Sequence, residues 1–428
     1  MLASGYHVNP RPARASNSTL EKLNIAAIGT GNRAAANISG CASQNIVALA
    51  DIDANFLGAC GEKYQQTRKY RDFREMLERE GDKVDAVIVA TPDHTHAPAA
   101  AMAMHMGKHT YCEKPLTHTV YEARKLAELA AAKGLVTQMG TQIHAGDNYR
   151  RVVELVESGT IGEIRECHVW VGVNYSGGKL LAKSKPTYVD WDLWLGPANK
   201  REYIESTING EHQTVHPYHW RWFWDYGNGG LGDFGCHYMD LAHWALKLRH
   251  PTSVSATGPE PEDEASTAGL IVKYKYPARG KLPPVDLTWY DGGKRPPMLS
   301  SYRGPDGEPL NWGSGQLFIG QHGAIVSDYS KHLLLPIYRA TDFARPEPYI
   351  APSLGHHNEW IDAIKNSGMT TCNFDYAGAL TEAVLLGVAS YRSGESLEWN
   401  AEQLRVTNSS AAQTWIHKEY RRGWTLDV

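Results

Sequence analysis

Short apolar segments alternate with segments of helical pattern through residues 23–143, and no other feature of the sequence constrains the fold as strongly. The apolar runs have the length and composition of strands that are buried on both faces. We predict strands at residues 23–29, 45–51, 84–90, 108–112 and 136–139. We predict helices from residue 31 to about residue 41 and at residues 54–64, 70–79, 96–106 and 120–133. This order indicates a doubly wound parallel α/β sheet, the Rossmann arrangement.

The pattern changes abruptly near residues 143–148, where we place a domain boundary. Predicted elements beyond it are a helix at 149–159, strands at 163–175, 267–276, 284–290, 316–319 and 323–328, and helices at 355–366 and 376–393. These indicate a second α/β domain, residues 144–428, with a large, mostly antiparallel open sheet. Residues 1–22 are rich in Pro, Ser and Asn without periodicity, and we interpret them as a tail preceding the Rossmann domain of residues 23–143.

Composition excludes several classes of protein. The 428 residues are 42% apolar and 21% charged, and the net charge of −4 is not clustered, so we expect neither a nucleic-acid surface nor a membrane surface. No apolar run approaches the roughly 18 residues of a membrane span. The six cysteines form no CxxC pair, and we expect no disulfide framework and no metal site. The 13 Trp and 22 Tyr suit a sugar-binding surface or simply packing.

A glycine-rich turn follows the first predicted strand and opens a helix. Its sequence, Gly29-Thr30-Gly31-Asn32-Arg33-Ala34, has the form GxGxxA. The first glycine permits a tight turn, and the second lets the backbone approach a pyrophosphate at the helix N-terminus. Asp51 ends the second predicted strand, where a carboxylate accepts hydrogen bonds from an adenosine ribose and repels a 2′-phosphate. No Arg follows Asp51 directly, so we predict a site for NAD rather than NADP.

Two further signatures carry a family resemblance. The stretch Glu113-Lys114-Pro115-Leu116-Thr117 follows a predicted strand, and the loop 91–96 (TPDHTH) follows another. Together with the glycine-rich turn and with residues 229–240 (GGLGDFGCHYMD), they resemble the Gfo/Idh/MocA family of glucose–fructose oxidoreductases and inositol dehydrogenases. The C-terminal stretches 355–368 and 391–400 also resemble this family, so the resemblance covers residues 23–428.

The resemblance implies a Rossmann domain, a second domain whose open sheet often forms an oligomer interface, and chemistry on sugars or cyclitols. It places Lys114, Asp233 and His237 on the usual catalytic positions. A histidine is suited to accept a hydroxyl proton near pH 7, and a nearby lysine would stabilise the alkoxide. Asp233 and His237 are four residues apart and share one face if 233–247 is helical, with Asp240 as a candidate supporting residue. The alternative to a catalytic role is structural: an ion pair between Lys114 and Asp233 beside a buried His237.

Loops at the carboxyl ends of the strands should line the cofactor. For His94 and His96 the alternative is a hydrogen bond at the start of a helix. The predicted cofactor contacts are Gly29, Thr30, Gly31, Asn32, Arg33, Asp51, Ile52, Thr91, Pro92, His94, His96, Glu113, Lys114 and Gln142.

We expect the substrate to contact residues that follow the last predicted Rossmann strand, among them His144. We also expect it to contact the segment 216–226, in which aromatic residues surround Arg221 and Asp225. The alternative for that segment is a packed loop with satisfied polar groups. The predicted substrate contacts are Lys114, His144, Trp220, Arg221, Asp233 and His237.

Three functions fit these features. The first is an NAD-dependent oxidoreductase that takes hydride from a CH–OH group of a sugar, polyol or glycoside. The second is an NAD-dependent glycoside hydrolase or lyase with transient oxidation and no net redox change, as in some members of the family. The third is a non-catalytic NAD-bound sensor. We expect a carbohydrate-like substrate and a homodimer or homotetramer. Residues 1–22 resemble the stretch after a twin-arginine signal in exported members, which favours the periplasm, with a cytoplasmic extension as the alternative.

Overall fold

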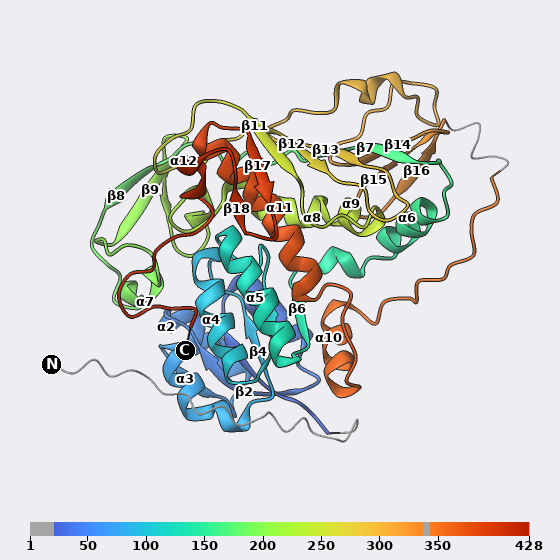
Figure 1. Cartoon of the computed structure of the whole chain (residues 1–428). Coiled ribbons are helices and arrows are strands. Elements are labelled where there is room, and N and C mark those ends of the chain that lie inside the picture. Colours follow the sequence, from blue (N-terminus) through green and yellow to red (C-terminus); the bar gives the residue numbers. More distant parts are fainter. Residues whose placement is uncertain (1–20, 337–342, 428) are drawn as a thin grey trace.

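A six-stranded parallel sheet forms the base of the molecule in Figure 1, with strand order β3-β2-β1-β4-β5-β6. The computed structural model describes residues 21–336 and 343–427, so most of the predicted N-terminal tail lies outside the described residues. The strands are β1 Asn24–Ile28, β2 Asn45–Ala50, β3 Arg68–Tyr70, β4 Ala86–Val89, β5 His109–Cys112 and β6 Thr137–Met139. The helices are α1 Asn32–Gly40, α2 Ala54–Lys63, α3 Phe73–Glu80, α4 Asp93–His105 and α5 Val120–Lys133.

Local sequence explains where these elements begin and end. The apolar strand β4 is buried along its whole length, as a central parallel strand must be. Helix α5 starts with a capping box in which Thr119 and Glu122 satisfy each other's backbone N–H groups, and it ends at Gly134 in the left-handed conformation. Its bounds agree with the predicted helix at 120–133, whereas helix α4 begins at Asp93, three residues before the predicted start.

A nine-stranded sheet dominates the second half of the chain, with order β16-β15-β14-β7-β13-β12-β11-β17-β18. Neighbouring strands are antiparallel except for the parallel pair β7–β13. Its strands are β7 Ile164–Trp170, β11 Ser253–Thr257, β12 Ile271–Tyr276, β13 Val285–Tyr290, β14 Gly315–Gly320, β15 Ala324–Ser327, β16 His332–Leu335, β17 Leu397–Asn400 and β18 Arg405–Val406. The predicted fold class is confirmed, although the long strand expected at 163–175 ends at Trp170.

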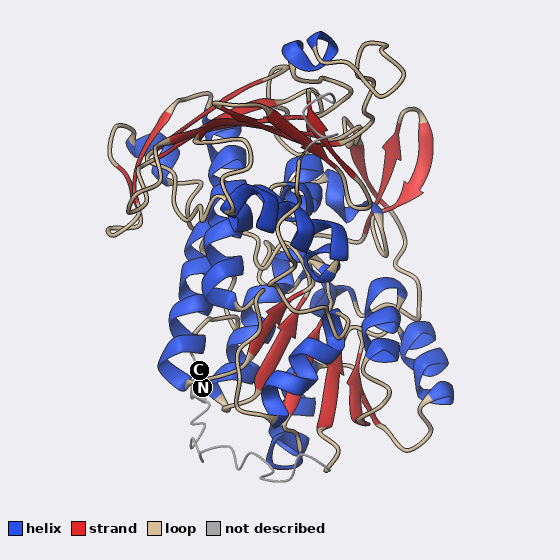
Figure 2. Ribbon diagram, turned by 90° about the vertical axis from the view of Figure 1, so that its right-hand side faces the viewer, coloured by secondary structure: helices blue, strands red, loops and turns tan. Residues whose placement is uncertain are grey.

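Helices lie between the two sheets and cover one face of the larger one (Figure 2). They are α6 Asp147–Glu157, α8 Gly229–Tyr238, α9 Asp240–Ala245 and α11 Phe374–Ser393. Helix α11 is almost entirely buried because it packs against α5 of the first domain, against α8 and against β11. On β12, Val272 and Tyr274 face these helices, whereas Lys273 and Lys275 are exposed on the opposite face.

Several segments outside the two sheets were not predicted. A small antiparallel sheet consists of β8 Lys179–Ala182, β9 Ile204–Ile208 and β10 Glu211–Thr214, with the short helix α7 Trp191–Leu195 between its first two strands. Helix α10 (His356–Lys365), by contrast, agrees with the predicted helix at 355–366. After the short helix α12 (Ser410–Gln413), residues 414–427 run back over the first domain, as the red trace in Figure 1 shows. No helix in the described part of the chain is long and apolar enough to cross a membrane.

Candidate active site

The glycine-rich turn has the shape that a bound pyrophosphate requires. Gly29 has a φ of +89°, and a Cβ there would lie 2.5 Å from the carbonyl oxygen of Ala90. A Cβ on Gly31 would lie 2.6 Å from the ring of Phe56, so neither position accepts a side chain without displacement. Gly31 is also the N-cap of α1, and no side chain caps this helix. The N-terminal backbone N–H groups of α1 are therefore available to a phosphate.

Asp51 lies at the carboxyl end of β2 and holds the glycine-rich turn. Its Oδ2 accepts hydrogen bonds from the backbone N–H and hydroxyl of Thr30, at 2.7 and 2.8 Å. Its Oδ1 accepts one from the backbone N–H of Asp53 at 2.9 Å. Burial raises the pKa of Asp51, and these hydrogen bonds oppose that shift. A carboxylate has about four acceptor positions, which leaves capacity for a ribose hydroxyl.

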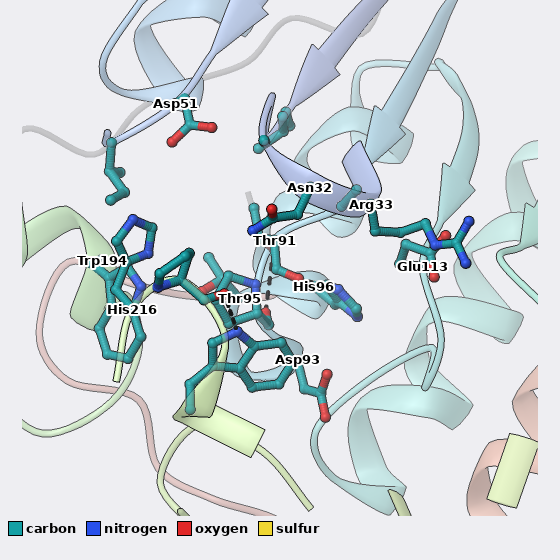
Figure 3. A pocket seen from close by; sticks show the side chains of 18 of the residues that line it. Asn32, Arg33, Asp51, Thr91, Asp93, Thr95, His96, Glu113, Trp194 and His216 are labelled. Atoms are coloured by element: carbon teal, nitrogen blue, oxygen red, sulfur yellow. Dashed lines mark hydrogen bonds between the residues drawn. The ribbon is translucent and has the colours of Figure 1, made fainter. Parts of the chain in front are cut away.

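These groups open into a cavity of about 370 Å³ between the two domains. Figure 3 shows Asp51, Asn32, Arg33, Thr91 and Glu113 around it. Twelve of the predicted cofactor residues line it, namely Gly29, Thr30, Gly31, Asn32, Arg33, Asp51, Ile52, Thr91, Pro92, His96, Glu113 and Lys114. The volume is within the usual range for small-molecule sites.

His94 does not line this cavity, contrary to the prediction. Its side chain is fully buried, with Nε2 2.9 Å from the carbonyl oxygen of Trp194 and Nδ1 3.3 Å from that of Tyr226. Burial lowers the pKa of His94 to about 3, so the ring is neutral and joins α4 to the second domain. His96 does line the cavity, and its ring nitrogens lie 2.8 Å from the carbonyl oxygens of Pro115 and Thr91.

Gln142 is also outside the cavity and supports Glu113 instead. Its Nε2 donates to Glu113 Oε1 at 2.8 Å and to the hydroxyl of Tyr111 at 2.9 Å. Glu113 Oε1 accepts a further hydrogen bond from Asn37 Nδ2 at 2.9 Å. A Cβ on Gly140 would lie 2.5 Å from the same oxygen, so the backbone approaches Glu113 closely. Gln142 therefore acts on the cofactor site through Glu113.

Lys114 and Asp233 meet across the domain boundary. Lys114 Nζ donates to the Asp233 carboxylate and, at 2.8 Å, to its backbone carbonyl oxygen. The same carboxylate accepts hydrogen bonds from Arg221 Nε at 3.3 Å and from the Tyr175 hydroxyl at 3.1 Å. Burial alone would raise the pKa of Asp233, but the Lys114 and Arg221 charges outweigh it and hold that pKa well below the usual range. Asp233 is therefore ionised, and it holds Lys114 at the cavity wall.

His237 follows Asp233 by one turn of α8, and both side chains line the cavity. Burial and the positive charge of Lys114 lower the pKa of His237 to about 3. Its Nδ1 is buried without a hydrogen-bond partner among the described residues. The ring is therefore neutral over the physiological range, and its Nδ1 is not engaged by another described residue.

Asp240 does not support His237, because α8 ends at Tyr238 and Asp240 begins α9. The Asp240 carboxylate instead lies 2.9 Å from His144 Nδ1 and accepts a hydrogen bond from the Tyr376 hydroxyl at 2.6 Å. His144 is buried, stacks on Trp244 with ring centroids 4.0 Å apart, and does not line the cavity. The structure therefore places His144, a predicted substrate contact, outside the cavity, whereas the predicted contacts Trp220 and Arg221 line it.

Other cavity residues were not predicted as contacts. Trp194 and His216 face the adenosine end near Asp51 (Figure 3), and His216 Nε2 lies 3.0 Å from Asp53 Oδ2. Trp424 reaches the same end from the C-terminal segment. Asp93 and Tyr218 also line the cavity and lie in the two segments expected to do so, 91–96 and 216–226, whereas the sequence gave no reason to choose Phe56, Arg71 and Tyr175.

Two protein-family models match this sequence, one in each domain. Residues 23–141 match the model described as "Oxidoreductase family, NAD-binding Rossmann fold", and residues 155–282 match that of its C-terminal alpha/beta domain. The chain belongs to the Gfo/Idh/MocA family. Its first domain is the NAD-binding domain of that family, as the sequence predicted.

Curated relatives of this Gfo/Idh/MocA chain match it over part of their length. An uncharacterized oxidoreductase, ORF334, of Rhizobium meliloti is 32% identical over 28% of this chain and 35% of its own. Inositol 2-dehydrogenase of Rubrobacter xylanophilus is 29% identical over 33% of this chain and 42% of its own. The chain thus spans less than half the length of these two relatives.

Solved structures share the fold over nearly the whole chain. GenD2 from gentamicin A biosynthesis, in complex with NAD, is 19% identical with a TM-score of 0.58 and covers 92% of this chain and 100% of its own. Levoglucosan dehydrogenase, in complex with NADH and levoglucosan, is 17% identical with a TM-score of 0.57 and covers 88% of this chain and 99% of its own.

Proposed function

We propose that this protein is an NAD-dependent dehydrogenase that oxidises a CH–OH group of a sugar or polyol. The single observation that carries the proposal is the meeting of Lys114, Asp233 and His237 at the wall of the cavity that the glycine-rich turn opens into. Inositol 2-dehydrogenase among the relatives and levoglucosan dehydrogenase among the structures support a polyhydroxylated substrate.

The side chains divide the chemistry between them. Bound NAD would supply the hydride acceptor. His237, which is neutral in this structure, is the residue that takes the hydroxyl proton, and this role requires that the bound substrate and cofactor raise its pKa from about 3 toward the working pH. Lys114, which lies beside it on the cavity wall, stabilises the negative charge that develops on the substrate oxygen. Asp233 keeps Lys114 in place and charged, and it accepts hydrogen bonds from Lys114, Arg221 and Tyr175, which leaves about one acceptor position for a substrate hydroxyl.

The test is the substitution His237→Ala, assayed by reduction of NAD with a panel of sugars and cyclitols. We expect a loss on the order of 10²–10⁴ in rate, the usual contribution of a general base. The dissociation constant for NAD should barely change, because His237 belongs to the second domain. The matched control is His219→Ala, whose ring contacts the Thr214 carbonyl oxygen and does not line the cavity. Near-full activity of His237→Ala would refute the mechanism.

A second candidate function is NAD-dependent cleavage of a glycoside, in which the cofactor oxidises and then re-reduces the sugar. The observation that favours it is the covering of the adenosine end by Trp194, His216 and Trp424, because such a reaction requires that NAD stay bound. Release of nitrophenol from nitrophenyl glycosides, without accumulation of NADH and with loss in His237→Ala, would select this function. NADH formed in step with substrate would select the dehydrogenase. A protein that binds NAD but does neither would be the sensor.

A further inference from the structure

Arg221 is built into the catalytic end of the cavity with part of its guanidinium group unused. Its Nε donates to Asp233, and its Nη1 donates to the carbonyl oxygen of Tyr218 at 3.0 Å. Its Nη2 has no acceptor within hydrogen-bonding distance among the described residues. The guanidinium lies over the rings of Trp220 and Tyr218, with its central carbon 4.2 and 4.7 Å from their centroids. Stacking fixes the plane of the group and leaves free N–H donors at the cavity wall.

The charges around this guanidinium do not balance. Lys114 and Arg221 are two cations that share one carboxylate, that of Asp233. His237 adds no charge, because its pKa is lowered to about 3. Among the other acids that line the cavity, Glu113 accepts hydrogen bonds from Gln142 and Asn37, and Asp93 is 2% exposed. Burial and the Asp233 charge raise the pKa of Asp93 well above the usual value, which favours its uncharged form beside the two cations.

Asp93 is a second, independent sign that a ligand group belongs here. Its Oδ1 is buried and has no hydrogen-bond partner among the described residues. Asp93 lines the same cavity as Arg221 and Lys114. A protonated carboxyl can donate one hydrogen bond, and a buried polar group without a partner is costly. A ligand oxygen would give this donor an acceptor.

We propose that the substrate is a sugar acid, whose carboxylate binds Arg221 while a nearby CH–OH group faces His237 and Lys114. This inference rests on the proposed dehydrogenase function and names the substrate class of that site. An arginine fork matches the planar geometry of a carboxylate, and a negative ligand compensates the excess cation. Because Lys114 and Arg221 reach the same Asp233 oxygen, the carboxylate and the reacting carbon must be close neighbours on the substrate.

The test compares each acid with its own neutral forms. Protein loaded with NAD is given glucuronate and galacturonate, their methyl esters, and glucose and galactose, and reduction of the cofactor is followed. Binding of the same compounds to NADH-loaded protein is measured by calorimetry. We expect at least one acid to exceed both its ester and its neutral sugar by roughly tenfold or more in kcat/KM and in affinity. Esters or neutral sugars that react and bind as well as the acids would overturn the proposal.

Variants separate the carboxylate contact from the chemistry. Arg221→Gln should bring the ratio of kcat/KM for the acid to kcat/KM for its ester close to one. Arg221→Lys should retain part of that preference, because lysine keeps the positive charge but lacks the two parallel N–H donors of a guanidinium group. The matched control is Arg392→Gln, since Arg392 also stacks between two tryptophans, Trp224 and Trp415, but lines a different cavity. This control should keep the wild-type ratio. Equal losses for acid and ester in Arg221→Gln would overturn the inference.

The two arms also distinguish this inference from the function on which it rests. If no compound reduces NAD, the dehydrogenase proposal fails, and the binding arm alone then decides whether the site selects acids. If neutral sugars reduce NAD in a His237-dependent way without preference for acids, the dehydrogenase proposal stands and the inference fails. The comparison of acid with ester uses wild-type protein, so it holds even if an Arg221 variant does not fold.

Discussion

Single residues in this site often serve two neighbours, and Asp51 shows the consequence for the choice of cofactor. Its carboxylate fixes the glycine-rich turn through Thr30 and faces the cavity where the adenosine ribose is expected. The sequence indicated no basic residue near it, but Arg71 also lines the cavity. Arg71 Nη2 donates to the carbonyl oxygens of Ile52 at 2.7 Å and Tyr188 at 3.3 Å. These bonds direct the arginine toward the backbone, so Asp51 should still determine the preference.

We therefore predict that NAD binds at least about tenfold more tightly than NADP, a difference of about 1.4 kcal/mol. Asp51→Ala should narrow this ratio and also weaken NAD binding, because the N–H and hydroxyl of Thr30 lose their acceptor. Calorimetric titration with both cofactors measures the two effects. The control is Asp85→Ala, which removes a carboxylate that accepts the backbone N–H of Asn24 at 2.8 Å, at the start of β1. Equal binding of NAD and NADP by the wild type would contradict the prediction.

At the scale of elements, the sequence predicted those whose pattern is local and missed those fixed by distant contacts. Helix α5 has its cap, its period and its terminal glycine within one stretch, and its bounds were predicted. Strand β3 is Arg-Lys-Tyr, which has no strand pattern of its own and pairs with β2 along the edge of the sheet. The strands β8 and β10 of the small sheet are four residues long with mostly exposed side chains, so they show little of the apolar pattern by which a strand is predicted.

The same reasoning explains the site. Lys114, Asp233 and His237 were found because they stand in recognisable motifs. His94 and His144 were misplaced because a position after a strand end does not tell whether the side chain faces the cavity or the protein interior. Trp424 carries no signal, since it reaches the cavity only through the return of residues 414–427 over the first domain.

That returning segment should slow the release of NAD. Trp424 packs against Phe73, with ring centroids 5.9 Å apart, and the Arg74 guanidinium lies 4.6 Å from its ring. Trp424→Ala removes this part of the cavity wall, and we expect NAD to dissociate faster by roughly tenfold, which is about 1.4 kcal/mol. Stopped-flow displacement of bound NADH measures the rate. Trp415→Ala, in the same segment but at the other cavity, should leave the rate near the wild-type value. Equal rates for Trp424→Ala and the wild type would contradict this role.

At the scale of the whole molecule, the outer face of the nine-stranded sheet is covered at one end by the short helix Pro297–Ser301 and its loop, whereas the long helices lie on the opposite face (Figure 2). Leu299, Leu310 and Trp312 cover its β7–β14 end, while Lys273, Lys275 and Asp286 are exposed farther along. We predict a dimer or tetramer joined through this face. Light scattering at micromolar concentration tests the prediction, and a double charge reversal, Lys273→Glu with Lys275→Glu, should shift the mass toward the monomer. A monomeric wild type would refute it.

Buried neutral histidines should make the whole fold sensitive to acid. Burial lowers the pKa of His94, His237, His243 and His356 to about 3 and that of His96 to about 4. The unfolded chain, with histidine pKa values near 6.5, binds more protons between those values and pH 6.5. The free energy of unfolding therefore falls as the pH drops through this window, by about 1.4 kcal/mol per pH unit for each such histidine.

Asp51 and Asp93 act in the opposite direction, since their raised pKa values let the folded state bind protons first. The histidines outnumber them, so we expect the Tm to fall by on the order of 10 °C between pH 7.5 and pH 5. Thermal unfolding followed by circular dichroism at several pH values measures the slope. An unchanged Tm over this range would show that the histidines are not buried in the neutral form.

The Lys114–Asp233 ion pair also constrains how a substrate enters. One partner belongs to each domain, and the Asp233 side chain is only 9% exposed. Swinging the domains apart would separate the pair and leave a carboxylate with less of its compensating charge, a change that costs several kcal/mol for a buried pair. Wide opening of the two domains is therefore penalised at the proposed catalytic residues. The substrate should enter and leave through the mouth of the cavity, beside the exposed Tyr218, while the two domains stay in contact.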